Sequence, residues 1–514
     1  MAVGIVATGM PEDPKSRSTT ALTAARGFRD EHGWKVLEDF ASLLRLPNIT
    51  GQIPDLRVNA AEIAERLRRR GAKVETVEFD GAAPVVVGRL ASDSASASAT
   101  ATLGVYVHYD GQPVDPQKWT REPFSATLTT RAWHERGEPL DYPGPSEPID
   151  PEWRIYARGA SDDKTPLAAL LGALDALDGA EVERTVDLVF LFEGEEESGS
   201  PNLARYMSEL APELQADAWL LCDGPIHQSR LPQIAFGVRG YSGFDLTFYG
   251  PERELHSGHY GNWVPNPALE LARFLSGCKD DTGTVTIDGF YNDTRPITEE
   301  DLRAIAHLPD VENNLMDELG FAGPEVEGGR YAERLMLPSF NVRGLGAAET
   351  GPSARNVIPS EATASVDIRL AAGDDPETMV DRVQTHLERN GYTVLDREPT
   401  SKERRRHRHL AKLTRNPGYP AVRSPIDSPL AETLLIAARS ASDTEVVALP
   451  TFGGSIPLYQ FEEILGAPVV IVPIANHDNN QHAPDENVRV GNLWYGIDLW
   501  ATLLVTDFGA LRQA

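Results

Sequence analysis

The chain has 514 residues and carries 77 Asp and Glu against 48 Lys and Arg, a formal net charge of -29. A surface this negative repels phosphate backbones and anionic membranes, so we expect neither nucleic acid nor a membrane as a partner. The length predicts two or more domains, and the two cysteines, Cys222 and Cys278, are too few for a disulfide framework or a cysteine-rich zinc site.

The N-terminus lacks the pattern of a secretory signal. No apolar stretch approaches the roughly 20 residues that span a bilayer. We therefore expect a soluble cytoplasmic protein.

The first and last parts of the chain alternate between strands and helices. The pattern predicts helices over 34–44, 60–70 and 164–177 and strands over 73–79, 84–90, 103–107, 155–157, 186–192, 218–222 and 468–473. This alternation indicates a mostly parallel, doubly wound sheet covered on both faces. The Ser/Ala-rich segment 92–100 is interpreted as an exposed loop, and 134–151 as an insertion.

The middle of the chain follows a different order. Strands are predicted over 241–249, 339–342, 362–370 and 392–395, and helices over 266–275 and 376–389. The order β-α-β-β-α-β fits a split ferredoxin-like α+β unit, disturbed by an insert over 279–334. The basic run 402–409 is interpreted as a solvated face. We therefore predict a catalytic domain in two parts, 1–238 and 418–514, with a smaller domain, 239–417, inserted between them.

Five groups of polar residues follow apolar runs of the predicted catalytic domain. They are His108 with Asp110, Asp162 with Asp163, Glu195 to Glu197, Asp223, and His482. Ligands bind beyond the carboxyl ends of the strands in open α/β sheets, so these groups should converge there. Two imidazoles and several carboxylates are what a pair of divalent metal ions needs.

Each group also has a structural interpretation. Asp162 or Asp163 could cap the helix that follows. The three glutamates could form a solvated acidic loop, although their mutual repulsion is relieved by a cation or a raised pKa. Asp223 could be a turn residue.

The remaining candidate site residues also allow more than one interpretation. Either His477 or His482 could be the metal ligand. His256 could be a surface histidine, and Arg369 could form an exposed ion pair or clamp a carboxylate with two hydrogen bonds. Asp110 is placed to accept a hydrogen bond from His108, as metal-bound imidazoles require.

The order of these motifs resembles one family closely. The matching stretches are Tyr106 to Pro113, Trp119 with Glu122 to Phe124, Arg158 to Lys164, Glu193 to Ser200, Leu255 to Gly258, Asn356 to Pro359 and Gly453 to Pro457. They are similar to the dinuclear zinc hydrolases that include carnosinase, glutamate carboxypeptidase, aminoacylase and succinyl-diaminopimelate desuccinylase. The nearest likeness is to the cytosolic nonspecific dipeptidase (carnosinase) branch, from about residue 30 onward.

The resemblance implies two divalent metal ions per chain, with Zn²⁺ expected and Mn²⁺ or Co²⁺ as alternatives. Asp162 would bridge both ions. His108 and Asp223 would complete one site, and Glu197 and His482 the other.

It also implies roles for the residues around the metals. Glu196 would be the general base that activates a water bridging the metals, and Asp110 would orient His108. The peptide bond between Asp162 and Asp163 would be cis. His256 would polarise the substrate carbonyl, reaching across a homodimer formed through the lid domain. The terminal carboxylate of the substrate would be bound by Arg369, Asn356 and Ser455.

The implied function is a dinuclear metallopeptidase that cleaves an amide bond in dipeptides or short peptides with a free carboxylate. An N-acyl amino acid deacylase or carbamoyl-amidase on the same scaffold is the first alternative, and a non-catalytic binding protein is the second. A phosphoesterase is disfavoured because the chain has no Walker-type loop. Val107, Tyr109, Arg343 and the insertion 134–151 depart from the family pattern and concern the substrate more than the metals.

Overall fold

The structure of the protein is a computed structural model that describes residues 14–93, 101–454, 458–509 and 511. The chain divides into two compact units. The first consists of Met1–Phe236, Ser424–Leu449 and Gln460–Ala514, and the second of Gly237–Arg423 and Pro450–Tyr459. The second unit is thus inserted, in sequence, within the first.

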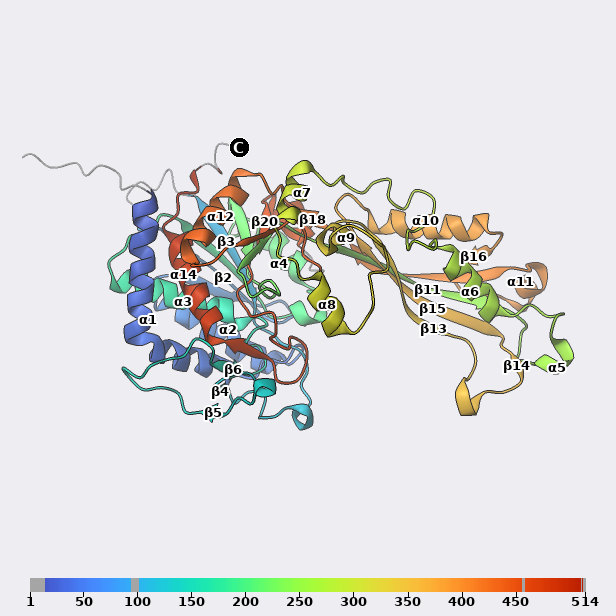
Figure 1. The fold of residues 1–514 in the computed structure, drawn as a ribbon, viewed down its shortest axis with the longest axis horizontal. Coiled ribbons are helices and arrows are strands. Elements are labelled where there is room, and N and C mark those ends of the chain that lie inside the picture. Colours follow the sequence, from blue (N-terminus) through green and yellow to red (C-terminus); the bar gives the residue numbers. More distant parts are fainter. Residues whose placement is uncertain (1–13, 94–100, 455–457, 510, 512–514) are drawn as a thin grey trace, which may run out of the picture. The chain divides into compact units, whose positions relative to one another are not determined.

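An eight-stranded sheet forms the centre of the first unit (Figure 1). In spatial order its strands are β1 (Lys73–Val77), β2 (Val85–Leu90), β7 (Asp187–Glu193), β3 (Thr102–His108), β8 (Ala218–Leu221), β20 (Val469–Ile471), β9 (Gln233–Ala235) and β19 (Val447–Leu449). The four central strands β7, β3, β8 and β20 run parallel to one another. Their carboxyl ends therefore lie at one edge of the sheet.

Both faces of this sheet are covered, which explains why its strands are near-continuous apolar runs. On one face, side chains of β3 such as Val105 belong to the same core as the helices α1 (Pro14–Leu44), α3 (Lys164–Gly179), α12 (Pro429–Ala441) and α14 (Val490–Leu504). On the other face, the Phe461 ring of α13 (Tyr459–Leu465) packs on Tyr106 and Trp219. The helices α2 (Ile53–Arg68) and α4 (Leu203–Glu209) complete the set.

A smaller four-stranded sheet belongs to the same unit. Its order is β21 (Asn487–Arg489), β6 (Arg154–Tyr156), β4 (Thr127–Thr129) and β5 (Pro139–Leu140). The strand β5 lies in the predicted insertion and pairs with β4. Three short 3₁₀ helices, η1 (Pro116–Lys118), η2 (Trp133–Glu135) and η3 (Glu196–Ser198), occupy the connecting segments.

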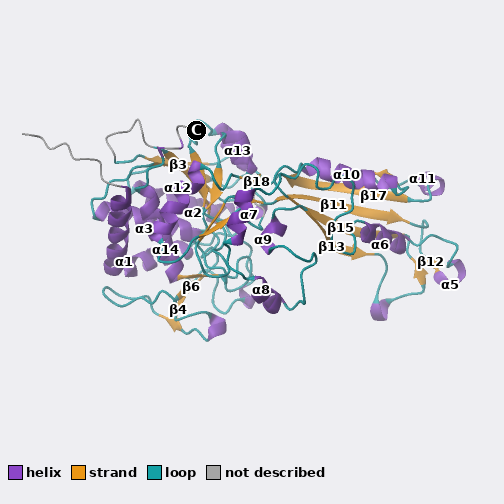
Figure 2. Ribbon diagram, turned by 45° about the horizontal axis from the view of Figure 1, so that its top comes forward, coloured by secondary structure: helices purple, strands orange, loops and turns teal. Residues whose placement is uncertain are grey.

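The second unit is built on a five-stranded sheet (Figure 2). Its order is β13 (Ser339–Gly346), β15 (Glu361–Leu370), β11 (Gly240–Tyr249), β17 (Leu410–Tyr419) and β16 (Thr393–Leu395). The helices α6 (Pro267–Gly277) and α10 (Pro376–Arg389) share one apolar core with β11 and β15. This is the α+β, ferredoxin-like arrangement.

The fourth strand of that arrangement differs from the sequence prediction. It is β17, which pairs with β11, whereas the predicted strand near 392–395 is β16, an edge strand parallel to β17. The basic run has no buried residue, as expected of a solvated face, and its residues Ser401–Arg406 form the helix α11 with a capping box between Thr400 and Glu403. That box satisfies backbone donors at the start of the helix.

Short elements complete the second unit. They are β10 (Gly237–Val238) with β18 (Val422–Arg423), β12 (Leu255–His256) with β14 (Val357–Ile358), α5 (Ser257–Tyr260), α7 (Glu299–Ala306), α8 (Glu312–Leu319), α9 (Tyr331–Leu335) and η4 (Gly351–Ser353). Among the residues described in either unit, no helix combines the length and the apolar character needed to cross a membrane.

Candidate metal centre

The carboxyl ends of four parallel strands deliver most of the predicted ligands. His108 is the last residue of β3, Asp223 follows β8 by two residues, and the glutamate loop follows β7. His482 lies in the loop after β20. Asp162 comes from the other sheet of this unit, because it follows β6, a strand of the smaller sheet. The centre is therefore assembled from both sheets of the first unit.

Two groups of ligand atoms form there, and they share one residue. His108, Asp162 and Asp223 form one group, and Asp162, Glu197 and His482 the other, with the ligand atoms of each group within 4.8 Å of one another. His108 Nε2 lies 2.9 Å from Asp162 Oδ1, and His482 Nε2 lies 3.1 Å from Asp162 Oδ2. The two oxygens of Asp162 thus face the two histidines.

The carboxylates of this cluster lie close together, and the positive charge around them is too small to balance their negative charge. Burial and the proximity of Asp162 raise the pKa of Asp223 to about 6. Burial, together with the charges of Asp223 and Asp162, also raises the pKa of Glu196 well above its usual range. Hydrogen bonds to Asp162 and Glu197 raise the pKa of His482 to about 10. Divalent cations would relieve the repulsion between these carboxylates.

Asp110 connects the two halves of the centre. Its carboxylate oxygens accept hydrogen bonds from the backbone N–H groups of Glu196, at 3.1 Å, and Glu197, at 3.2 Å. His108 Nδ1 lies 3.2 Å from the Asp110 carbonyl oxygen and 3.5 Å from its Oδ1. Asp110 therefore contacts His108, and it also holds the backbone that carries the candidate base and a candidate ligand.

The three neighbouring glutamates have separate environments. The Glu195 carboxylate accepts hydrogen bonds from the Ala83 backbone N–H, at 2.8 Å, and from Asn202 Nδ2, at 2.9 Å, so it is committed to the scaffold. Glu197 belongs to the metal-ligand group, and Gln112 Nε2 donates to its Oε2 at 2.8 Å. Glu196 is left near the cluster without belonging to either group.

Comparison with known proteins identifies the family. Residues 104–506 match the model of Peptidase family M20/M25/M40. The chain belongs to this family.

Relatives and solved structures agree with this assignment. The chain is 26% identical to the Cys-Gly metallodipeptidase DUG1 of Candida albicans over 429 residues, covering 80% of this chain and 78% of the relative. It is 25% identical to the human Beta-Ala-His dipeptidase over 466 residues, covering 87% and 83%. The M20 family metallo-carboxypeptidase Sso-CP2 from Sulfolobus solfataricus has a TM-score of 0.72 and 27% identity, covering 92% of this chain and 99% of that one. The protein is a metallopeptidase with the catalytic and lid domains of this family.

The donor set of this M20 peptidase fits divalent metal ions. Each group offers one imidazole nitrogen and carboxylate oxygens, a combination that Zn²⁺, Mn²⁺ and Co²⁺ all accept. Glu197 Oε1 is buried and has no hydrogen-bond partner among the described residues. A buried acceptor of this kind is satisfied when it binds a cation.

In the segment of Asp162 and Asp163, the structure agrees with one prediction and contradicts another. The peptide bond between Asp162 and Asp163 is cis. Asp163 occupies the N-cap position of α3, but its side chain makes no capping hydrogen bond, which contradicts the interpretation of Asp163 as the cap. Its carboxyl group is instead fully buried, and burial together with Asp223 raises its pKa well above the usual range.

The candidate substrate residues belong to the second unit. His256 is exposed, and its Nδ1 accepts a hydrogen bond from the Gly258 backbone N–H. Asn356 is exposed, and Arg369 forms an ion pair with Asp367 at 3.3 Å. Ser455 lies outside the described residues. His256, Asn356 and Arg369 are not members of the metal-ligand groups found among the described residues.

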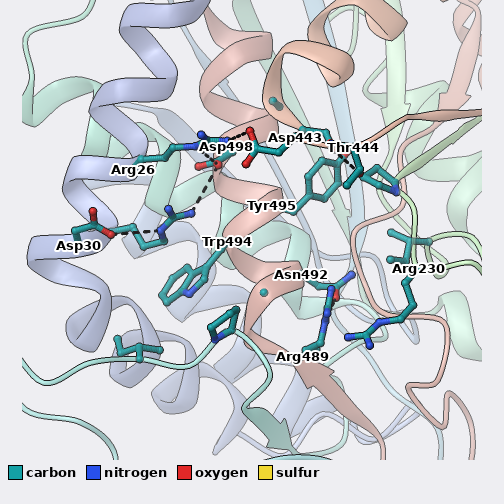
Figure 3. Close-up of a pocket in the computed structure, with 18 of the residues that line it drawn as sticks. Arg26, Asp30, Arg230, Asp443, Thr444, Arg489, Asn492, Trp494, Tyr495 and Asp498 are labelled. Atoms are coloured by element: carbon teal, nitrogen blue, oxygen red, sulfur yellow. Dashed lines mark hydrogen bonds and ion pairs between the residues drawn. The ribbon is translucent and has the colours of Figure 1, made fainter.

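A cavity of about 710 Å³ also lies in the first unit, between α1, α14 and the insertion (Figure 3). Arginines line it: Arg26 lies 3.1 Å from Asp498, which also lines the cavity, and Arg230 and Arg489 each pair at 2.7 Å with Glu152, which does not. It contains none of the metal-ligand residues, so it is separate from the centre.

Sequence reasoning missed two residues that support the centre. Gln112 lies in the first motif, but its sequence context does not reveal that it contacts Glu197. Glu486 follows His482 by four residues and binds the backbone of the Asp162 segment. Its nearness to a predicted ligand was the only signal in the sequence.

Proposed function

We propose that this M20 peptidase is a dipeptidase that hydrolyses the amide bond of a short peptide with a free carboxylate. The names of the curated relatives, which are dipeptidases, support this substrate class. The observation that carries the proposal is the pair of ligand groups sharing Asp162, with Glu196 adjacent to both. Zn²⁺ is the expected metal. A cytoplasmic location also remains a prediction.

In this proposal His108, Asp162 and Asp223 would hold one ion, and Asp162, Glu197 and His482 would hold the other. When bound, the ions would supply positive charge that polarises the amide carbonyl and makes water easier to deprotonate. Glu196 would accept a proton from the water whose oxygen adds to the carbonyl carbon, and it would return a proton to the amine nitrogen as the C–N bond breaks.

The substrate's recognition is assigned to the second unit. We propose that His256 polarises the carbonyl, and that Arg369, Asn356 and Ser455 bind the terminal carboxylate. Arg369 has the planar, two-pronged donor geometry that suits a carboxylate. A carboxylate clamp serves dipeptides and N-acyl amino acids alike, so the preference rests on the relatives: hydrolysis of dipeptides such as Cys-Gly and β-Ala-His should exceed hydrolysis of N-acyl amino acids, which the deacylase alternative would favour.

The test of this function is Glu196→Gln. The change keeps the side-chain shape but removes the base, so turnover of dipeptides should fall roughly 100- to 10,000-fold. Metal content, measured by atomic emission, should stay at the wild-type level. The matched control is Glu195→Gln, because Glu195 is bound to the scaffold through Ala83 and Asn202 and should leave turnover nearly unchanged. A Glu196→Gln enzyme with full activity would refute the assignment.

A further inference from the structure

One buried carboxylate is surrounded by donors from the segment that carries Asp162. Glu486 is fully buried. Its Oε1 accepts hydrogen bonds from the backbone N–H groups of Ser161 and Asp162, at 2.9 and 3.0 Å, and from Ser161 Oγ at 3.0 Å. Its Oε2 accepts from Arg158 Nη1 at 2.7 Å and from the Gly159 backbone N–H at 3.1 Å. Five donors from four residues of the stretch 158–162 thus converge on one carboxylate.

Glu486 shares its chain segment with His482. The His482 imidazole lies 3.1 Å from Asp162 Oδ2 and 3.2 Å from Glu197 Oε2. The segment continues into β21, which pairs with β6, and the Ala157 backbone N–H donates to the Glu486 carbonyl oxygen at 3.1 Å. A single segment therefore reaches one ligand group directly through His482 and holds the shared aspartate through Glu486.

We propose that Glu486 is a positioning residue that fixes the backbone of the shared ligand Asp162 relative to His482 and so sets the spacing of the two metal sites. The inference rests on the proposed metal centre. Metal affinity depends on residues that orient the ligands, and losing one such residue typically costs 10- to 100-fold in affinity. Glu486 holds the peptide N–H of the bridging residue itself, so its loss should reach both ligand groups.

Only a carboxylate suits this position. An ionised carboxylate is purely an acceptor and can take four or more hydrogen bonds on its two oxygens. In a glutamine, the amide nitrogen would face donors in either orientation: the N–H groups of Ser161 and Asp162, or those of Arg158 and Gly159. Glu486→Gln therefore leaves buried donors unpaired without removing side-chain volume.

A simpler role for Glu486 is a buried ion pair with Arg158 that stabilises the fold and nothing else. The matched control is Asp498→Asn in α14. Asp498 is also buried and pairs with two arginines, Arg26 at 3.1 Å and Arg29 at 3.7 Å, but it belongs to neither ligand group. Both substitutions should lower stability, because each leaves arginine without its buried carboxylate.

The experiment measures Zn²⁺ affinity of the full-length protein by competition with a chromogenic chelator, and urea unfolding of the metal-free protein. Glu486→Gln should weaken binding of at least one Zn²⁺ about 10- to 100-fold and change the visible spectrum of the Co²⁺-loaded protein. Asp498→Asn should keep wild-type affinity and spectrum. Equal Zn²⁺ affinity in the wild type and Glu486→Gln would overturn the proposal.

Ser161→Ala provides a second variant if Glu486→Gln does not fold. It removes one of the five donors, and a single hydrogen bond corresponds to about 2- to 10-fold in affinity. Unchanged affinity in Ser161→Ala would then overturn the proposal. Failure of the proposed function looks different, because in that case the wild-type protein itself would not bind two Zn²⁺ ions.

Discussion

Glu193 is a buried carboxyl group outside the metal-ligand groups. It is 2% exposed, and its Oε2 accepts hydrogen bonds from the hydroxyl groups of Tyr106, at 2.5 Å, and Ser200, at 3.1 Å. Burial, assisted by the charge of Asp110, raises its pKa to about 8. The folded protein therefore holds a proton on Glu193 at a pH where the unfolded chain has released it.

This proton makes stability depend on pH. Between the ordinary pKa of 4.5 and the folded value of about 8, the folded state binds the extra proton, so the free energy of unfolding falls as pH rises. Glu193→Gln keeps a neutral group at every pH. Relative to this variant, the wild type should lose up to about 5 kcal/mol between pH 4.5 and 8.5. Urea unfolding at both pH values measures the difference, and groups common to both proteins cancel. Parallel pH profiles would contradict the raised pKa.

The residues that could be found from the sequence are those with local signals. His108, Asp162, Glu197, Asp223 and His482 each follow an apolar run, and the structure brings them together. Gln112 and Glu486 act through contacts between residues 85 and 324 positions apart. A single sequence carries no information on such pairs, because nothing in their own neighbourhood depends on the distant partner.

At the scale of elements, the helices α3 and α14 lie close together because a glycine of α14, Gly496, stands at their contact. A β carbon at Gly496 would lie 2.8 Å from both Ala169 Cβ and Ile474 Cγ2. Contacts this short do not occur without displacement of the neighbours. Gly496 therefore sets how closely α14 packs on α3 and on the segment that follows β20, which continues toward His482.

Gly496→Ala should destabilise the protein by about 1–3 kcal/mol, because the added methyl group overpacks this contact. Gly27→Ala is the control, since Gly27 lies in α1 and has no atom within 4 Å of its added β carbon. That change should stabilise by about 0.5–1 kcal/mol through the higher helix propensity of alanine. Chemical denaturation of both variants measures the two effects. Destabilisation of equal size in both would show that the close contact is unimportant.

The elements missed from the sequence lack clear periodicity. The strand β17 contains Lys412, Thr414 and Arg415, none of them buried, and Pro417 with Gly418 near a register shift. Its position beside β11 comes from pairing with the sheet rather than from its own pattern. The first half of α1 is similar: it begins 20 residues before the predicted start, and the buried side chains described there are two alanines, Ala21 and Ala25. Tertiary packing, not an apolar stripe, stabilises both elements.

At the scale of the whole molecule, the second unit presents apolar side chains at an open sheet edge. The edge strand β13 exposes Val342 at 40% and Leu345 at 62%, and Trp263 is 78% exposed. Exposed edges and apolar residues favour association with another chain. These features support the prediction of a homodimer through this unit, in which His256 serves the active site of the partner.

Mixed dimers test this prediction. Glu196→Gln and His256→Ala chains should each be inactive alone, since each homodimer lacks one required group at both sites. If His256 acts across the dimer, a heterodimer has one complete site, formed by the intact Glu196 of one chain and the intact His256 of the other. Co-expressing the two variants equally should then restore about a quarter of the wild-type rate, because half of the dimers are mixed and each has one working site of two. Differently tagged chains confirm that mixed dimers form. Mixed dimers without activity would place His256 outside the partner's site, and a chain that sediments as a monomer would exclude the dimer itself.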